Sequence, residues 1–471
     1  MSFEQPISLE TNTRGVRCMS TAKHPNIILI LTDHFRRDAL GKSTPNLMAL
    51  AAEGTQFTNA YCATPLCGPS RISIITGMYP SQTGVCGNQA DVIHPELRDD
   101  TFMHHLQQAG YYTAMIGKHH YIDSYGYCID VTENDEELRR YGFDYIFQVQ
   151  DDGENGHNDD EYTNYLKKRG KLETFRKALR KGGFRHVFDD PDETADGFIG
   201  VNGIRFVEDY IKDRPFYLNL SFIGPHPPMW HPGELQHDPE AMSPSLGAPD
   251  EASVRLRRAH YMDKCALIDA YVGQLVATLK AKGIYDNTVI IFTSDHGDCL
   301  GDYGILDKRY FYENSAGVPF LMCGPGIPKE ERMNGPRVSK ALVSHLDLYP
   351  TILRLAGTRL AFDRRRPGLD IPALVRGEPH IGRNAVFAEL ATCAMVRTGN
   401  WKLVFDPEQG GVQHLYNLTV DPLEQQNLAG VAGYEHVTLD LVQRLLTHRI
   451  QQTQYTHIKE EQRLQRVRVL P

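Results

Sequence analysis

Two continuous apolar runs, far apart in the chain, both lead into the dipeptide Asp-His. Residues 26–32 (NIILILT) precede Asp33-His34, and residues 288–293 (TVIIFT) precede Ser294-Asp295-His296. Runs without a polar face are typical of strands buried on both sides of a parallel sheet. The carboxyl ends of such strands form the functional edge of open α/β sheets. We therefore expect a sheet that brings two carboxylates and two imidazoles together.

The pattern along the rest of the chain alternates between strands and helices. Further strands are predicted at residues 112–116 and 215–223, and helices at 101–109, 197–212 and 252–282. This alternation is typical of an α/β sheet covered by helices on both faces. After residue 384 the pattern changes to short alternating strands at 393–398, 401–406 and 412–418, followed by a helix at 437–451. These segments predict a small antiparallel sheet packed on the large domain.

Residues 123–193 interrupt the alternation. They hold an acidic stretch from Asp151 to Glu161 and then a basic stretch from Arg176 to Arg185. We interpret the charge runs as a solvated surface insertion. The alternative is that the basic part admits an anionic substrate.

Composition excludes several classes of protein. With 50 Lys+Arg against 59 Asp+Glu the net charge is -9, which argues against a nucleic-acid partner. No apolar run approaches the ~20 residues that a membrane helix needs. The first 26 residues carry no apolar stretch of signal-peptide type, so a cytoplasmic location is expected. The nine cysteines are odd in number and scattered, which favours reduced thiols.

The repeated Asp-His pairs suggest a metal site. Carboxylate oxygens with neutral imidazoles suit a divalent ion, but the mixture does not select among calcium, magnesium, manganese and zinc. Each Asp could instead cap the following turn, with each His in solvent. Two such pairs at equivalent places favour the metal.

The segment Cys67-Gly-Pro-Ser-Arg71, followed by Thr76-Gly77, is the most specific feature of the sequence. A proline near the start and a glycine at the end predict a short helix, whose N-terminal end attracts anions. The pattern C-x-P-S-R resembles the signature of the type I sulfatases, a family of the alkaline phosphatase superfamily. In that family the cysteine is converted to formylglycine, whose hydrated aldehyde offers two hydroxyls on one carbon.

Other segments resemble the same family in order and spacing. They are T-P-N-L at 44–47, G-Y-Y-T at 110–113, G-K-H-H at 117–120, P-H-P-P at 225–228, S-D-H-G-D at 294–298, Lys308, V-P-F at 318–320, G-P-G-I at 324–327 and D-L-Y-P-T at 347–351. In the family, G-K-H-H usually reads G-K-W-H. The resemblance implies an alkaline phosphatase-like fold, with a large mixed, mostly parallel sheet flanked by helices and a small C-terminal antiparallel sheet plus helix. The implied division is an N-terminal extension (1–24), a catalytic domain (25–383) and a small subdomain (384–471).

The resemblance also implies roles for individual residues. Asp33, His34, Asp295 and His296 would hold one divalent ion together with the modified Cys67. The resemblance implies calcium as the ion. His34 stands where the family more often has Asp, so the site carries one anionic ligand fewer, which weakens the case for calcium and leaves manganese as the alternative. Arg71 and Lys118 would stabilise formylglycine and the charge of the transferred group, and His120 would act as base. Lys118, His226 and Lys308 would bind the substrate, with His226 or Lys308 as general acid.

The function implied is a sulfatase that hydrolyses sulfate esters, with a sulfated carbohydrate as the expected substrate and a formylglycine-generating enzyme as partner. One alternative is a phosphonate monoester or phosphodiester hydrolase of the same superfamily. Another is a non-catalytic relative that binds sulfated glycans. Neither a nucleic acid nor a membrane is expected as partner, and the sequence leaves the oligomeric state open.

Overall fold

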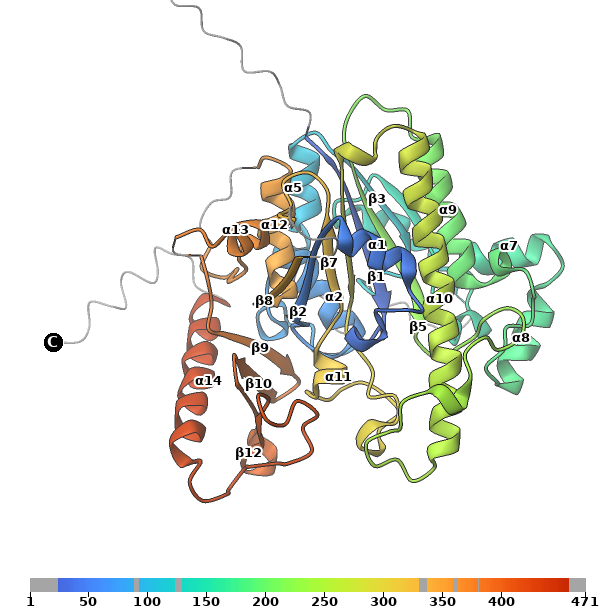
Figure 1. Ribbon diagram of the computed structural model, residues 1–471. Helices are drawn as coiled ribbons and strands as arrows, with labels where there is room; N and C mark the ends of the chain where they lie inside the picture. The colour runs from blue at the N-terminus through green and yellow to red at the C-terminus, as the bar shows by residue number, and fades with distance from the viewer. Residues whose placement is uncertain are drawn as a thin grey trace, which may run out of the picture.

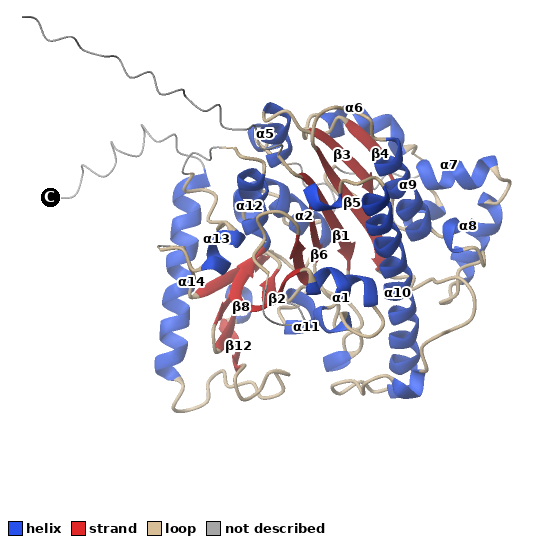
Figure 2. Ribbon diagram, turned by 45° about the horizontal axis from the view of Figure 1, so that its top comes forward, coloured by secondary structure: helices blue, strands red, loops and turns tan. Residues whose placement is uncertain are grey.

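A computed structural model describes residues 24–88, 93–122, 129–329, 337–358, 363–379 and 381–456. Its largest element is an eight-stranded sheet with the order β4-β3-β5-β1-β6-β7-β2-β8 (Figures 1 and 2). The strands are β1 (Asn26–Asp33), β2 (Gly54–Tyr61), β3 (Tyr112–Gly117), β4 (Tyr145–Gln148), β5 (Phe216–Pro225), β6 (Thr288–Ser294), β7 (Phe320–Cys323) and β8 (Arg337–Ser344).

The two apolar runs become neighbouring strands at the centre of this sheet. β1 pairs in parallel with β5 on one side and β6 on the other, with Ile28 opposite Leu218 and Ile290. Every residue of β1 and β6 is buried, as their composition predicts. Only β7 runs against its neighbours, so the sheet is mixed and mostly parallel. The predicted fold class is confirmed.

Helices cover both faces of the sheet, and β1 contributes to a core on each. Ile27, Leu29 and Leu31 join the core beneath one set of helices, whereas Ile28 and Ile30 join the other. The first set comprises α2 (Cys67–Thr76), α5 (Phe102–Gln108), α12 (Leu348–Leu355) and α13 (Ile371–Arg376); the second comprises α1 (Pro45–Ala52), α7 (Glu161–Lys168), α8 (Leu172–Lys181), α9 (Ala195–Asp209) and α10 (Glu251–Ala281).

Four short helices complete the large domain: α3 (Pro80–Thr83), α4 (Pro95–Arg98), α6 (Asp135–Arg139) and α11 (Glu313–Ala316). Within the described residues, none of the helices has the length and apolar character that crossing a membrane requires.

The C-terminal part forms a second, antiparallel sheet with the order β12-β11-β10-β9. Its elements are β9 (Ala385–Leu390), β10 (Cys393–Thr398), β11 (Trp401–Asp406), β12 (Gly411–Asn417) and α14 (Glu435–Thr456). A separate core joins this sheet to α14 through Leu403, Leu415, Leu441 and Leu445. The predicted small sheet plus helix is confirmed. The domain boundaries stay a prediction, and the extension 1–24 lies outside the described residues apart from His24.

The interpretation of residues 123–193 as a solvated insertion is wrong for its acidic part. Asp151, Asp152 and Asp160 are buried, because β4 joins the edge of the sheet and carries the segment against it. The basic part lies on and after α8, where Lys177 and Arg180 are exposed.

Candidate active site

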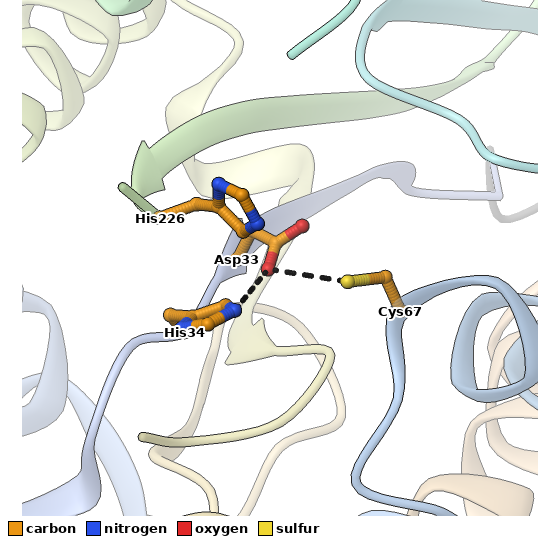
Figure 3. Close-up of side chains that lie close together, drawn as sticks. All are labelled: Asp33, His34, Cys67 and His226. Carbon is orange, nitrogen blue, oxygen red and sulfur yellow. Dashed lines mark hydrogen bonds and ion pairs between the residues drawn. The ribbon is translucent and has the colours of Figure 1, made fainter. Parts of the chain in front are cut away.

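The predicted site residues converge where β1 and β6 end. Asp33 closes β1, Asp295 and His296 follow β6, and Cys67 is the first residue of α2. The Cys67 Sγ lies 3.2 Å from His296 Nε2 and 3.7 Å from Asp33 Oδ1, and Asp33 Oδ1 lies 3.6 Å from His296 Nε2. All four side chains are buried. Figure 3 shows Asp33 facing both Cys67 and His34, with His226 beside them.

The donor atoms of this cluster fit a divalent metal ion. Two overlapping groups each bring one ligand atom per residue within 4.8 Å of one another. Both contain Asp33 and Cys67, which are joined by Asp295 and His296 in one group and by His34 and His226 in the other. Carboxylate oxygens and imidazole nitrogens are ordinary ligands of such ions. In this structure the Cys67 sulfur stands in for the oxygens that a modified side chain would carry.

Hydrogen bonds orient the two imidazoles that follow the strands. His296 Nδ1 donates to the Gly297 carbonyl at 2.8 Å, which leaves the Nε2 lone pair facing Cys67. His34 Nδ1 lies 2.7 Å from Asp298 Oδ2, and its Nε2 lies 2.6 Å from the Lys308 ammonium. Because an ammonium only donates, His34 Nε2 accepts and Nδ1 carries the proton. Such outer hydrogen bonds commonly fix metal-ligating histidines.

Two buried lysines place positive charge around the Cys67 sulfur. Lys308 Nζ lies 3.1 Å from Sγ, and Lys118 Nζ pairs with Asp33 and with both oxygens of Asp151, at 2.7 and 2.8 Å. Burial opposes charge on the Cys67 thiol, but the two lysines and His296 hold its pKa well below the usual value. These cations therefore favour the thiolate form of the unmodified residue.

Arg71 connects the two metal-type carboxylates. Its guanidinium donates to Asp295 Oδ2 at 2.8 Å and to Asp33 Oδ2 at 3.3 Å. It also donates to the Ser221 hydroxyl and the Lys118 carbonyl, at 2.8 and 3.0 Å. Arg71 is fully buried, so these bonds rather than solvent satisfy the charge. In this arrangement its first effect is to orient the carboxylates.

The two remaining imidazoles lie next to the same residues. The His226 ring meets His34 edge-on, with centroids 4.5 Å apart. Burial, together with the charge of Lys308, lowers the pKa of His226 to about 3. His120 lies with Asp151 and Glu154 in a third group of donor atoms within 4.8 Å of one another. All residues predicted for the site are thus brought together.

Several residues of the site were not predicted. Asp151 binds Lys118, Glu154 lies beside His120, Asp298 binds His34 and Ser221 binds Arg71. Asp151 comes three residues after β4, so recognising β4 as a strand would have placed it at the carboxyl edge. Asp298 belongs to the S-D-H-G-D segment but had been assigned no role.

The mixed sheet and its flanking helices form the alkaline phosphatase-like fold that the sequence resemblance implies. The family model described as Sulfatase matches residues 25–358, and the one described as N-sulphoglucosamine sulphohydrolase, C-terminal, matches residues 301–451. The choline-sulfatase of Rhizobium meliloti is 31% identical over 87% of this chain and 83% of that relative. The ulvan-active sulfatase of Formosa agariphila is 27% identical over 93% of this chain and 84% of the relative.

Solved structures agree on the fold. The phosphonate monoester hydrolase of Agrobacterium radiobacter superposes with a TM-score of 0.74 at 24% identity, covering 91% of this chain and 96% of that one. A protein solved with its substrate D-glucosamine-2-N,6-O-disulfate gives 0.67 at 23%, covering 93% and 100%. The chain belongs to the sulfatase family and is a sulfuric ester hydrolase.

Proposed function

We propose that this sulfatase hydrolyses sulfate esters of carbohydrates, using a formylglycine made from Cys67 and one divalent ion. One observation carries the proposal. The Cys67 side chain lies in a metal-type donor set, with the Lys308 ammonium 3.1 Å from its sulfur and with Lys118, His120 and His226 close by. A nucleophile there would face cations that neutralise a sulfate and groups that move protons.

Calcium is the proposed ion and manganese the alternative. Asp33, Asp295 and His296 would hold it, with His34 and residue 67 adjacent. With a histidine at position 34, Asp33 and Asp295 are the two carboxylates of the donor set, which is why manganese is retained as an alternative. When bound, the ion would polarise the sulfate oxygens and lower the pKa of the attacking hydroxyl. The hydrated aldehyde of residue 67 would supply one hydroxyl for attack on sulfur and a second for release of sulfate.

The chain's own residues account for binding and proton transfer. Lys308 lies 3.1 Å from the sulfur of residue 67 and Lys118 acts on it through its charge, so both would neutralise the sulfate oxygens. His226 and Lys308 both lie beside His34 and would flank the leaving oxygen, one of the two acting as general acid. His120 would accept the proton of the second hydroxyl, while Arg71 keeps Asp33 and Asp295 in place.

The alcohol is proposed to be a sugar. Relatives include an ulvan-active sulfatase and an N-acetylglucosamine-6-O-sulfatase, although the choline-sulfatase is more similar in sequence. Two phosphonate monoester hydrolases share the fold at 24% and 21% identity, and phosphonate hydrolysis is therefore the alternative reaction that we propose to test. The formylglycine-generating enzyme as partner and the cytoplasmic location also stay predictions.

The test is a substrate comparison with protein co-expressed with a formylglycine-generating enzyme. We would measure kcat/KM for p-nitrophenyl sulfate, a panel of monosaccharide sulfates, choline sulfate and a phosphonate monoester, with calcium or with manganese. The proposal expects a sugar sulfate to be the best substrate and Cys67→Ala to be inactive. Preference for choline sulfate would overturn the sugar assignment, and preference for the phosphonate would overturn the chemistry. Tight binding of sulfated glycans without turnover would favour the non-catalytic alternative.

The role of His226 is tested through the leaving group. His226→Ala should reduce the rate on alkyl sulfates more than on p-nitrophenyl sulfate, because general acid help matters most when the leaving oxygen is basic. Equal losses on both substrates would remove the assignment.

A further inference from the structure

A second constellation lies away from Cys67, where three segments meet at helix α10. Ser43 lies in the turn before α1, His237 in the segment between β5 and α10, and Asp263 on α10. Figure 1 shows α1 alongside α10, which places the turn next to this helix. None of the three residues belongs to the cluster around Cys67.

Their side chains form one continuous chain of hydrogen bonds. Ser43 Oγ lies 2.7 Å from His237 Nε2, and His237 Nδ1 lies 2.5 Å from Asp263 Oδ1. The carboxylate acceptor requires the proton on Nδ1, so Nε2 is the acceptor of the serine hydroxyl. This is the polarity in which a histidine takes the proton of an attacking serine.

The Asp263 carboxylate, which would orient the His237 ring, is itself held in place. Asp263 is buried, and its two oxygens accept the backbone N–H groups of His237 and Gln236 at 3.1 and 2.8 Å. His237 has 22% of its side chain exposed, and Ser43 is half-buried. The base is therefore anchored from the protein side, and the hydroxyl stays within reach of a small molecule.

Donors for a developing oxyanion are present in the same turn. Within the described residues, no acceptor takes a hydrogen bond from the backbone N–H of Lys42 or of Ser43. The N–H of a nucleophile's own residue is a usual oxyanion donor, and Lys42 adds an exposed cation beside it.

We propose that Ser43, His237 and Asp263 form a second catalytic centre, which hydrolyses carboxylic esters of short acyl groups. Ser43 Oγ bonds to the ester carbonyl carbon while its proton passes to His237 Nε2. The bond from carbon to the alcohol oxygen then breaks, and the alcohol leaves with that proton. Water attacks the acyl group with His237 again as base, the carboxylic acid departs and Ser43 regains its proton.

The experiment uses the full-length protein and an alkyl fluorophosphonate, which labels activated serines covalently. Peptide mass spectrometry is expected to find the label on Ser43, and Ser43→Ala and His237→Gln are expected to abolish it. The hydrolysis of p-nitrophenyl acetate should fall roughly 100-fold in both variants. Sulfatase activity of Ser43→Ala should stay within about twofold of the unmodified sequence, whereas Cys67→Ala should keep the esterase rate.

Ser253→Ala is the matched control, because Ser253 is exposed and its hydroxyl donates to Asp250 at 2.7 Å without a histidine. It should change neither labelling nor esterase rate. The proposal is overturned if Ser43 takes no label while Ser43→Ala and the unmodified sequence hydrolyse the ester equally. In that case the hydrogen bonds only attach the turn and the segment of His237 to α10.

Discussion

Lys402 offers the sharpest test of how the small sheet is joined to the catalytic domain. It lies on β11 with 1% of its side chain exposed. Its ammonium lies 2.7 Å from Glu313 Oε1 and 2.6 Å from Glu424 Oε1, and it donates to the Phe311 carbonyl at 2.8 Å. Phe311 and Glu313 follow Lys308 closely in sequence. Lys402 therefore connects the small sheet to the segment that supplies a cation to the active site.

The loss of stability in Lys402→Met depends on which partners the Glu313 and Glu424 carboxylates retain. Glu313 retains Arg37 at 2.7 Å and the Tyr61 hydroxyl at 2.8 Å, whereas Glu424 retains, among the described residues, only the Glu313 backbone N–H. Removing one partner of a buried ion pair usually costs 3–5 kcal/mol. Burial already raises the pKa of Glu424, so this group can take up a proton and limit the penalty. We expect a loss of about 3 kcal/mol at pH 7, and recovery of about half in Lys402→Met with Glu424→Gln.

The assay is urea unfolding followed by tryptophan fluorescence. The chain has two tryptophans, and Trp401 neighbours Lys402, so a Trp230→Phe background reports on the small sheet. The control is Lys280→Met, whose half-exposed pair with Glu53 at 3.6 Å should contribute less than about 1 kcal/mol. The reasoning is refuted if Lys402→Met and Lys280→Met lose the same free energy of unfolding.

Three further predictions concern the site and the pH dependence of stability. Asp151→Asn should lower kcat/KM roughly 10-fold, because Lys118 loses its bidentate partner. Chelation should abolish turnover and calcium should restore it, because Asp33 and Asp295 would lose their ion. Burial lowers the pKa of His186 to about 3 in the folded protein. Below about pH 6.5 the unfolded chain therefore binds a proton at this residue and the folded protein does not. Stability should fall by about 2 kcal/mol from pH 6.5 to 5.0 through this group, and His186→Gln should remove that part of the slope.

Each of these has a contradicting result. Unchanged kcat/KM in Asp151→Asn would mean that Lys118 needs no partner. Full turnover after exhaustive chelation would exclude an essential ion. An unaltered slope of unfolding free energy against pH in His186→Gln would show that His186 does not stay neutral in the folded protein.

The sequence predicted the central strands of the large sheet but not several of its other strands. β1 and β6 are uniformly apolar, so burial on both faces follows from composition alone. β2 (GTQFTNAY) and β8 (RVSKALVS) carry polar residues through most of their length, and β4 and β7 have four residues each. Such strands form because neighbouring strands of the sheet pair with them, and their own sequences carry no clear strand pattern.

The site shows the same division. Residues in dense motifs, such as Cys67 and Asp295, were predicted because their chemistry and spacing are specific. Asp151 was missed because its carboxylate lies in a charged run that looks solvated, and only the position of β4 shows that it is buried against Lys118. No sequence spacing predicts the contact among Ser43, His237 and Asp263, because these residues come from three separate segments that only the fold brings together.

The central claim is that residue 67 is a formylglycine in the working enzyme. Peptide mass spectrometry across residues 62–71, on protein from its own host or co-expressed with a formylglycine-generating enzyme, tests it directly. The account predicts an aldehyde at position 67 whose fraction scales with sulfatase activity. Full activity in protein that carries only unmodified cysteine at position 67 would contradict it.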